Sequence, residues 1–195
     1  MGEQLILASS SKYKKSLLER LSLPFLCVSA NIDETPQQDE EPKQLVKRLA
    51  EQKALAIASK HPGSLIIGAD QVGEVNGKIL EKPGNFENAY KQLKYQSGKS
   101  VYFHCGVTLA KQQSDGTIIK TTELSTTEVI FRQLSDKEIT IYLQKDKPFD
   151  CAGSFKSESL GISLFEQINS NDPTCLIGLP LILVRKMLSN KEINT

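Results

Sequence analysis

The feature that most constrains the fold is an apolar run at residues 65–67, followed by polar residues and a tight-turn signal. The run predicts a buried strand, with Asp70 and Gln71 at its carboxyl end. An Asn-Gly pair at 76–77 supplies the positive φ values of a two-residue hairpin, which returns the chain to Lys82. Because open α/β sheets bind ligands beyond strand ends, this acid and this lysine are candidates for phosphate chemistry. The alternative is that Asp70 only caps or ends the strand.

The composition predicts one ordinary α/β domain. The 195 residues are 39% hydrophobic and 24% charged, and 24 Lys+Arg against 23 Asp+Glu give a net charge of +1. No overall field therefore draws the chain to nucleic acid or to a membrane surface. No apolar run approaches the ~20 residues of a membrane span, so we expect a cytoplasmic enzyme or binding protein. Two histidines and four scattered cysteines argue against zinc and favour oxygen-bound Mg²⁺ or Mn²⁺ if a metal is present.

Near the N-terminus, a short strand at 5–8 precedes three serines, Ser9 to Ser11, and a helix. Serines at such a turn are natural N-caps, and the same geometry binds phosphate through backbone N–H groups. Lys12, Lys14 and Lys15 in the first turn are unfavourable for the helix dipole. A bound anion would offset that cost, which favours the phosphate interpretation.

A second helix is predicted from Pro42, with an apolar stripe that runs to Ala58. Lys53 falls on or beside this stripe, so its amine must either reach solvent or meet an acid. The preceding polar segment, 31–41, contains Asp33 and Glu34. For these acids a solvated loop is the default interpretation.

The remaining pattern predicts alternating helices and strands. Helices are expected after Asn85 and after the capping box 135–138, and a last one from Pro180 to about Leu188. Strands are expected at 101–110, 117–131 and 162–168. The segment 150–161 is polar and rich in small residues, with Lys156 close to Glu158. It is either an ordinary loop with a surface ion pair or part of a site.

Four ordered segments together resemble the Maf family of nucleoside triphosphate pyrophosphatases. They are Leu5-Ile-Leu-Ala-Ser9-x-Ser11, Asp33-Glu34-Thr35, Arg48-Leu-Ala-Glu51-x-Lys53-Ala54, and Gly68-Ala-Asp70-x-Val72 with Lys82-Pro83. The resemblance implies a single two-lobed Maf/ITPase-like α/β domain over residues 1–190. That domain would have a mixed, elongated, twisted sheet flanked by helices and a central substrate cleft, followed by a polar tail at 191–195.

Two details narrow the resemblance to the family branch that acts on 7-methyl-GTP. These are the Asp70-Gln71 pair, where the dTTP/UTP branch has Asp-Thr, and the segment Cys-Ala-Gly-Ser-Phe-Lys-Ser-Glu at 151–158. Two positions depart from the family pattern. Lys14 stands where an arginine is usual, which keeps the charge and loses the planar two-point grip on phosphate. Tyr13 stands where tryptophan is common, and it still offers an aromatic face.

The resemblance also implies roles for individual residues. Asp70 would be the general base, and Glu34 with Asp70 would hold a divalent cation. The expected phosphate-binding residues are Ser9, Ser11, Lys14, Lys53 and Lys82, and the expected specificity residues are Tyr13, Gln71 and Glu158. The implied reaction cleaves a modified nucleotide to its monophosphate and pyrophosphate, which keeps it out of nucleic acids. The alternatives are a non-catalytic nucleotide-binding regulator of cell division and a dTTP/UTP-type enzyme. The family also implies a possible homodimer.

Overall fold

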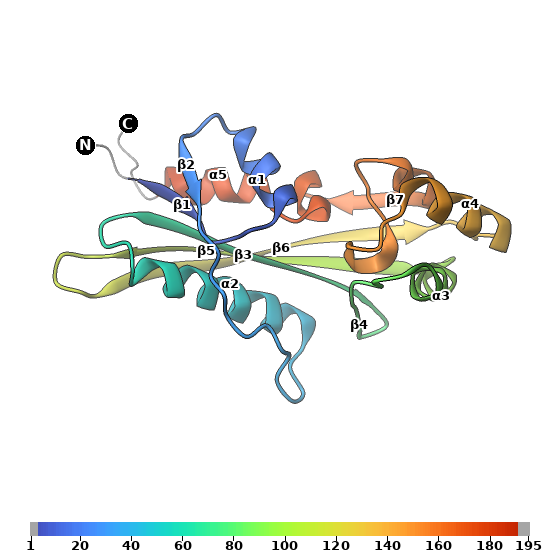
Figure 1. Ribbon diagram of the computed structural model, residues 1–195, viewed down its shortest axis with the longest axis horizontal. Helices are drawn as coiled ribbons and strands as arrows, with labels where there is room; N and C mark the ends of the chain where they lie inside the picture. Colours follow the sequence, from blue (N-terminus) through green and yellow to red (C-terminus); the bar gives the residue numbers. More distant parts are fainter. Residues whose placement is uncertain (1–3, 191–195) are drawn as a thin grey trace.

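A computed structural model describes residues 4–190, and one long mixed sheet runs through it (Figure 1). Its strands are β1 (Leu5–Leu7), β2 (Phe25–Cys27), β3 (Leu65–Val75), β4 (Lys78–Leu80), β5 (Ser100–Gln112), β6 (Ile118–Phe131) and β7 (Phe165–Ser170). The order across the sheet is β2-β1-β3-β5-β6-β7, with β4 paired to β3. β1 is parallel to β2 and to β3, and the other pairs are antiparallel. The expected mixed α/β fold is confirmed.

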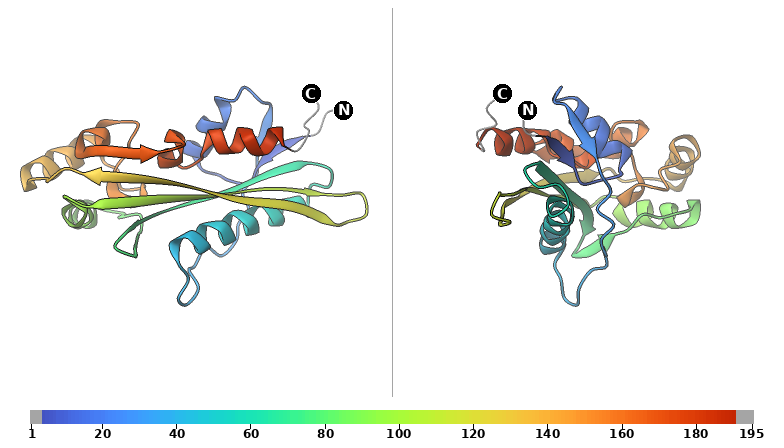
Figure 2. Two further views of the ribbon diagram at one scale, coloured as in Figure 1. Left: turned by 180° about the vertical axis from the view of Figure 1, so that it is seen from behind. Right: turned by 60° about the vertical axis from the view of Figure 1, so that its left-hand side comes forward.

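Helices cover different faces at the two ends of this sheet. They are α1 (Lys12–Glu19), α2 (Pro42–Ala58), α3 (Phe86–Gln96), α4 (Asp136–Asp146) and α5 (Leu181–Ser189), with 3₁₀ helices η1 (Ala152–Ser154), η2 (Leu160–Leu164) and η3 (Pro173–Ile177). Figures 1 and 2 show α1 and α5 on one face and α2 on the other, while α3 and α4 lie at the far end. The long strands β3, β5 and β6 join the two ends.

Each end has its own apolar core, because different helices bury different parts of the strands. At the first end, Leu17 of α1 and Val184 of α5 pack on one sheet face, and Ile57 of α2 packs on the other. At the far end, a separate cluster gathers around Phe103 and Phe155. The clusters on the two faces of the first end and the separate cluster at the far end are the structural basis of the two predicted lobes.

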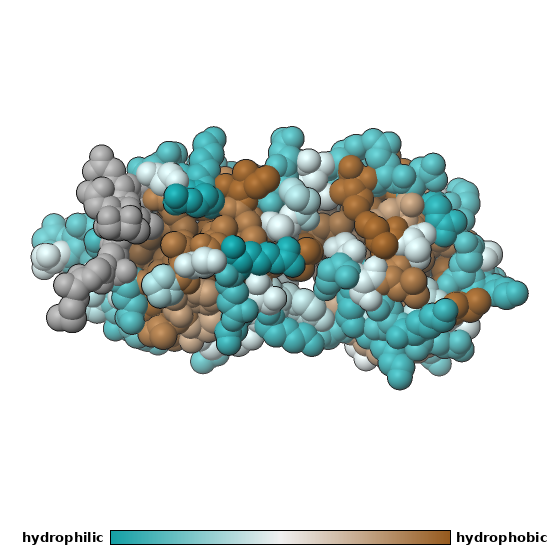
Figure 3. Space-filling model, turned by 90° about the horizontal axis from the view of Figure 1, so that it is seen from above, coloured by the Kyte–Doolittle hydropathy of each residue, from teal (hydrophilic) through white to brown (hydrophobic). Residues whose placement is uncertain are grey.

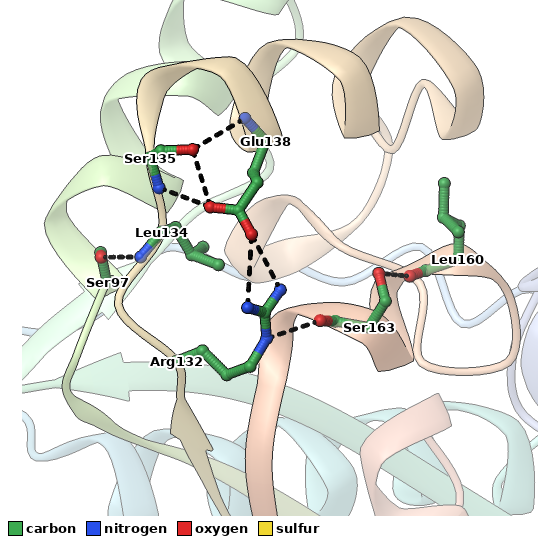
Figure 4. Close-up of polar contacts among 7 residues, drawn as sticks. All are labelled: Ser97, Arg132, Leu134, Ser135, Glu138, Leu160 and Ser163. Carbon is green, nitrogen blue, oxygen red and sulfur yellow. Dashed lines mark hydrogen bonds and ion pairs between the residues drawn. The ribbon is translucent and has the colours of Figure 1, made fainter.

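The far end is also held by polar contacts (Figure 4). Arg132, directly after β6, donates to the carboxylate of Glu138 at 3.3 Å and to the carbonyl of Ser163 at 2.9 Å. The same glutamate completes the predicted capping box with Ser135 at the start of α4. One guanidinium group therefore ties α4 to η2.

Local turn and capping predictions are confirmed. Asn76 and Gly77 have φ values of 51° and 75°, as the hairpin requires. Helix α2 begins at Pro42, and the Asn85 side chain caps α3 through the amide N–H of Asn88. These features depend on neighbouring residues only, which is why the sequence specifies them.

Two predictions about strands are wrong. β3 does not end near Asp70 but continues to Val75, because residues 66–74 pair with β5 without interruption. The expected strand at 162–168 is a 3₁₀ helix over 160–164 followed by β7. Its alternating pattern is only partly that of a strand, because Leu164 is buried in the far core from a helical turn. The predicted polar tail at 191–195 lies outside the described residues.

Candidate active site

A gap along one edge of β3 forms the centre of a large cavity. β1 pairs with residues 65–67 of β3, and β4 pairs with 73–75. Between them, none of the strands in the described chain covers residues 68–72 on this edge. Because side chains alternate between faces, Asp70 and Gln71 enter the gap from opposite sides of the sheet. The predicted site therefore lies at a free strand edge rather than at a strand end.

The cavity has a volume of about 730 Å³ and is walled by both lobes. Every residue predicted for the site lines it: Ser9, Ser11, Tyr13, Lys14, Glu34, Lys53, Asp70, Gln71, Lys82 and Glu158. The structure thus brings together segments that lie far apart in the sequence, from the serine turn before α1 to the loop after η1. Their individual roles stay predictions.

At the floor of the cavity, Lys53 joins two carboxylates. Its Nζ lies 2.6 Å from Oδ1 of Asp70 and 2.8 Å from Oε1 of Glu34. Burial alone would lower the pKa of Lys53, but the two carboxylates outweigh it and raise the pKa above its ordinary value. Of the two predicted arrangements for the Lys53 amine, exposure to solvent or contact with an acid, the structure shows the second. Glu34 is therefore more than a solvated loop residue, because it forms an ion pair with Lys53. Each carboxylate keeps its second oxygen for another partner.

The serine turn and α1 form the next wall. The Ser11 hydroxyl accepts from the backbone N–H of Lys14 at 3.4 Å, so Ser11 is the N-cap of α1. The Ser9 hydroxyl accepts from the N–H of Ser11 at 3.1 Å. Burial lowers the pKa of Lys14, although the Asp70 carboxylate opposes that shift. The turn thus combines capping hydroxyls with an amine that faces the same acid as Lys53.

Aromatic and acidic side chains lie at the end of the cavity nearer the far lobe. The Tyr13 hydroxyl donates to Oδ2 of Asp150 at 3.3 Å, and the Cys151 thiol lies 3.8 Å from that hydroxyl. Burial opposes ionisation of Asp150, but the Cys151 hydrogen bond and the Lys12 ammonium outweigh it and lower the pKa of this carboxyl. Glu158 is exposed at the rim.

Gln71 contacts the protein itself. Its amide nitrogen donates to the carbonyls of Cys175 and Leu176 in η3, at 2.7 and 3.0 Å. The donors of this side chain are therefore engaged, and its carbonyl oxygen is the group left to face a ligand. Gly178, with a φ of 125°, lies opposite this oxygen and the Lys14 amine.

Comparison with known proteins identifies the family. The model of the family described as Maf-like protein matches residues 4–191. The chain belongs to the Maf-like protein family. It is 49% identical over 185 residues to a 7-methyl-GTP pyrophosphatase of Bordetella pertussis, covering 95% of this chain and 90% of that one. It is 50% identical over 193 residues to the 7-methyl-GTP pyrophosphatase of Pseudoalteromonas atlantica, covering 98% and 96%.

The fold of this Maf-like protein also resembles that of a solved structure. The Ham1 protein of Staphylococcus aureus matches with a TM-score of 0.55 at 14% identity, over 97% of this chain and 100% of that one. At that identity the likeness concerns the fold alone. None of the helices described here is long and apolar enough to cross a membrane.

Sequence reasoning missed how the loop that carries Glu34 is held. Arg48 of α2 donates to both carboxylate oxygens of Glu40, at 2.6 and 2.7 Å, and to the carbonyl of Thr35 at 3.1 Å. The clamp fixes the chain directly after Glu34, at Thr35 and again at Glu40, and so helps to place Glu34 at Lys53. Arg48 stood within a matched family segment, but its partner is eight residues away in an irregular loop, which no periodic pattern predicts.

Proposed function

We propose that this Maf-like protein hydrolyses 7-methyl-GTP to 7-methyl-GMP and pyrophosphate. The observation that carries the proposal is one cavity that holds the Lys53-bridged carboxylates, further lysines and an aromatic–acidic end. The names of the two relatives, at about half identity over nearly the full length, support the same substrate. The reaction would keep modified nucleotides out of nucleic acids.

Asp70 is the proposed general base. Its carboxylate takes a proton from water as the water oxygen bonds to the α-phosphorus. The bond from that phosphorus to the α,β-bridging oxygen breaks, and pyrophosphate leaves with the electron pair. Proton transfer of this kind contributes roughly 10²- to 10⁴-fold. The 2.6 Å contact with Lys53 fixes the position of the carboxylate.

The negative charge of the triphosphate requires neutralisation. We assign Lys14, Lys53 and Lys82 to the phosphates, with the hydroxyls of Ser9 and Ser11 at the start of α1. Lysines here bind as point charges, so orientation must come from several of them acting together.

The second oxygens of Glu34 and Asp70 suit a divalent cation. The described residues contain no group of three or more His, Cys, Asp or Glu side chains arranged to hold a metal ion. Magnesium commonly uses one or two carboxylates and completes its shell with water and substrate phosphates, so this donor set fits Mg²⁺ or Mn²⁺. When bound, such a cation would neutralise charge on the phosphates.

Base recognition falls to Tyr13, Gln71 and Glu158. Methylation at position 7 makes guanine cationic, and a cation is attracted to an aromatic face such as that of Tyr13. Glu158 can accept hydrogen bonds from the guanine edge. Gln71 contributes its carbonyl oxygen and, through its amide, the position of η3.

The test is pyrophosphate release by the purified protein with Mg²⁺ or Mn²⁺. The panel comprises 7-methyl-GTP, GTP, dTTP and UTP. We expect 7-methyl-GTP to be turned over fastest. Asp70→Asn should abolish turnover while nucleotide binding, measured by calorimetry, persists. Asp136→Asn is the control, because it makes the same substitution outside the cavity lining, in the ion pair between α4 and Lys94 of α3.

Each rival makes a different prediction in this assay. A nucleotide-binding regulator would bind the nucleotides and release no pyrophosphate. A dTTP/UTP-type enzyme would prefer the pyrimidine nucleotides. Near-normal turnover by Asp70→Asn would remove Asp70 as the base.

We further place the reaction in the cytoplasm and infer a homodimer, with no nucleic-acid partner. β2 is an edge strand, and Leu26 on it is 49% exposed. Figure 3, which views the molecule from above Figure 1, shows apolar side chains gathered on the half that carries β2 and α5. Edge strands with apolar side chains favour association. Sedimentation analysis of Leu26→Lys against the unaltered protein tests the dimer.

A further inference from the structure

Two charged residues of the cavity, Lys12 and Asp150, have no role in the hydrolysis described above. Both line the cavity, and both contact Tyr13. The Nζ of Lys12 lies 5.0 Å from the centroid of the Tyr13 ring and 3.5 Å from Oδ2 of Asp150. The same carboxylate oxygen accepts from the Tyr13 hydroxyl. A cation, an aromatic face and a carboxylate are thus already assembled at the base-binding end of the cavity.

The cation in this assembly is loosely held. The side chains of Lys12 and Asp150 are 74% and 54% exposed. Exposed ion pairs and exposed cation–π contacts are both weak, because water competes for each charge. A competing cation that enters the cavity can therefore take the place of the ammonium group.

A 7-methylguanine base has the charge and shape for that exchange. Its positive charge is attracted by the ring face and by the carboxylate, as the ammonium is. A neutral guanine stacks on the ring but lacks the positive charge that the Asp150 carboxylate attracts, so it competes less well with Lys12 for this carboxylate. Discrimination then depends on a charge interaction that only the methylated base makes.

Given the proposed function, we propose that Asp150 is a specificity-determining residue that pairs with the cationic base, and that Lys12 competes with the base for it. Removal of the two charges must then change selectivity in opposite directions. Without the Asp150 charge, the methylated base loses its advantage. Without the Lys12 charge, the methylated base meets an unpaired carboxylate and no like charge.

The experiment measures kcat/KM for 7-methyl-GTP and for GTP, and the ratio of the two values is the readout. Asp150→Asn keeps the shape and an acceptor for the Tyr13 hydroxyl, and it should lower the ratio roughly fivefold through a higher KM for 7-methyl-GTP. Lys12→Gln should raise the ratio by about threefold or more. Lys15→Gln removes the same charge from the same helix, where Lys15 pairs with Glu19 outside the cavity lining, and should leave the ratio unchanged.

A further variant separates charge recognition from simple positioning of the ring. Tyr13→Phe removes the hydroxyl that contacts Asp150 and keeps the aromatic face. If Asp150 acts through its charge, most of the selectivity survives in this variant. If Tyr13→Phe lowers the ratio as much as Asp150→Asn does, Asp150 only orients the ring and the proposal is overturned.

Two other results would also overturn it. One is an Asp150→Asn ratio within twofold of the wild-type ratio. The other is a Lys12→Gln variant that loses efficiency equally for both nucleotides, because this would make Lys12 a phosphate ligand. Calorimetric binding of 7-methylguanosine and guanosine repeats the comparison without hydrolysis. A protein that hydrolyses neither nucleotide would thus refute the proposed function, while the nucleoside affinities still decide the roles of Asp150 and Lys12.

Discussion

Substitution of Gly68 by alanine should push α2 away from the sheet and disturb the Lys53–Asp70 contact. A Cβ atom built on Gly68 would lie 2.1 Å from the carbonyl oxygen of Ala50 and 2.7 Å from the backbone nitrogen of Ala54. Ordinary van der Waals contact begins at 3.4 Å, so the nearer atom must retreat by about 1.3 Å. Both atoms belong to the α2 backbone, and neither can move unless the helix moves.

The magnitude follows from two opposing effects. Alanine in place of a strand glycine gains roughly 0.5–1 kcal/mol, because the unfolded chain loses less entropy on folding. Overpacking typically costs about 1–3 kcal/mol, and a rigid backbone contact places Gly68→Ala at the upper end. The net loss in the free energy of unfolding should be ~2 kcal/mol, which corresponds to a Tm lower by roughly 4–8 °C. Since misplacement of a catalytic group by about 1 Å can cost 10²-fold, turnover should fall by one to two orders of magnitude.

Gly73 on the same strand provides the matched control. Its added Cβ would lie 2.8 Å from the ring of Phe103, which is buried in the far core, and no backbone atom is among its three nearest neighbours. Gly73→Ala should therefore strain the far core, at a cost of about 1–2 kcal/mol, and leave α2 and the Lys53–Asp70 contact in place. Urea unfolding followed by circular dichroism gives both values, and pyrophosphate release gives turnover. Equal losses of turnover in the two variants, or full activity in Gly68→Ala, would refute the argument that backbone contact with α2 positions Lys53.

Three further predictions concern the site and the far core. Because burial lowers the pKa of Lys14, the affinity for a non-hydrolysable nucleotide should fall as the pH rises through that lowered pKa, and Lys14→Arg should keep its affinity to higher pH. Calorimetry over a neutral-to-alkaline pH series checks this, and identical pH profiles for the two proteins would contradict it. Glu158→Gln should lower the preference for 7-methyl-GTP over GTP more than it lowers turnover, as steady-state kinetics would show, whereas an unchanged ratio would remove Glu158 from base recognition. Phe155 makes edge-on contacts with three other phenylalanine rings, so Phe155→Ala should lower the free energy of unfolding by about 3–5 kcal/mol, measured with urea. A decrease below about 1 kcal/mol would show that these rings do not stabilise the far core.

Local sequence patterns predicted most of the elements of this protein. The Asn-Gly pair at 76–77 requires positive φ at two adjacent residues, so the hairpin needed no tertiary information. The start of α2 at Pro42 and the cap at Asn85 depend on groups within one helical turn. The family resemblance then gathered residues from distant segments, and the cavity lining contains all of them.

What only the tertiary structure decided is how distant segments meet. The length of β3, and with it the place of Asp70 in the middle of a strand, depends on hydrogen bonds to β5, which lies a helix and a hairpin later in the chain. The gap at the edge of β3 exists because β1 and β4 are both too short to cover it. The Arg48–Glu40 clamp and the contact of Lys12 with Asp150 each join a helix to an irregular segment. The sequence by itself determined which chemical groups the protein carries and where its local turns fall. Their arrangement into a site required the sheet, because strand pairing acts between residues whose separation along the chain leaves no local pattern.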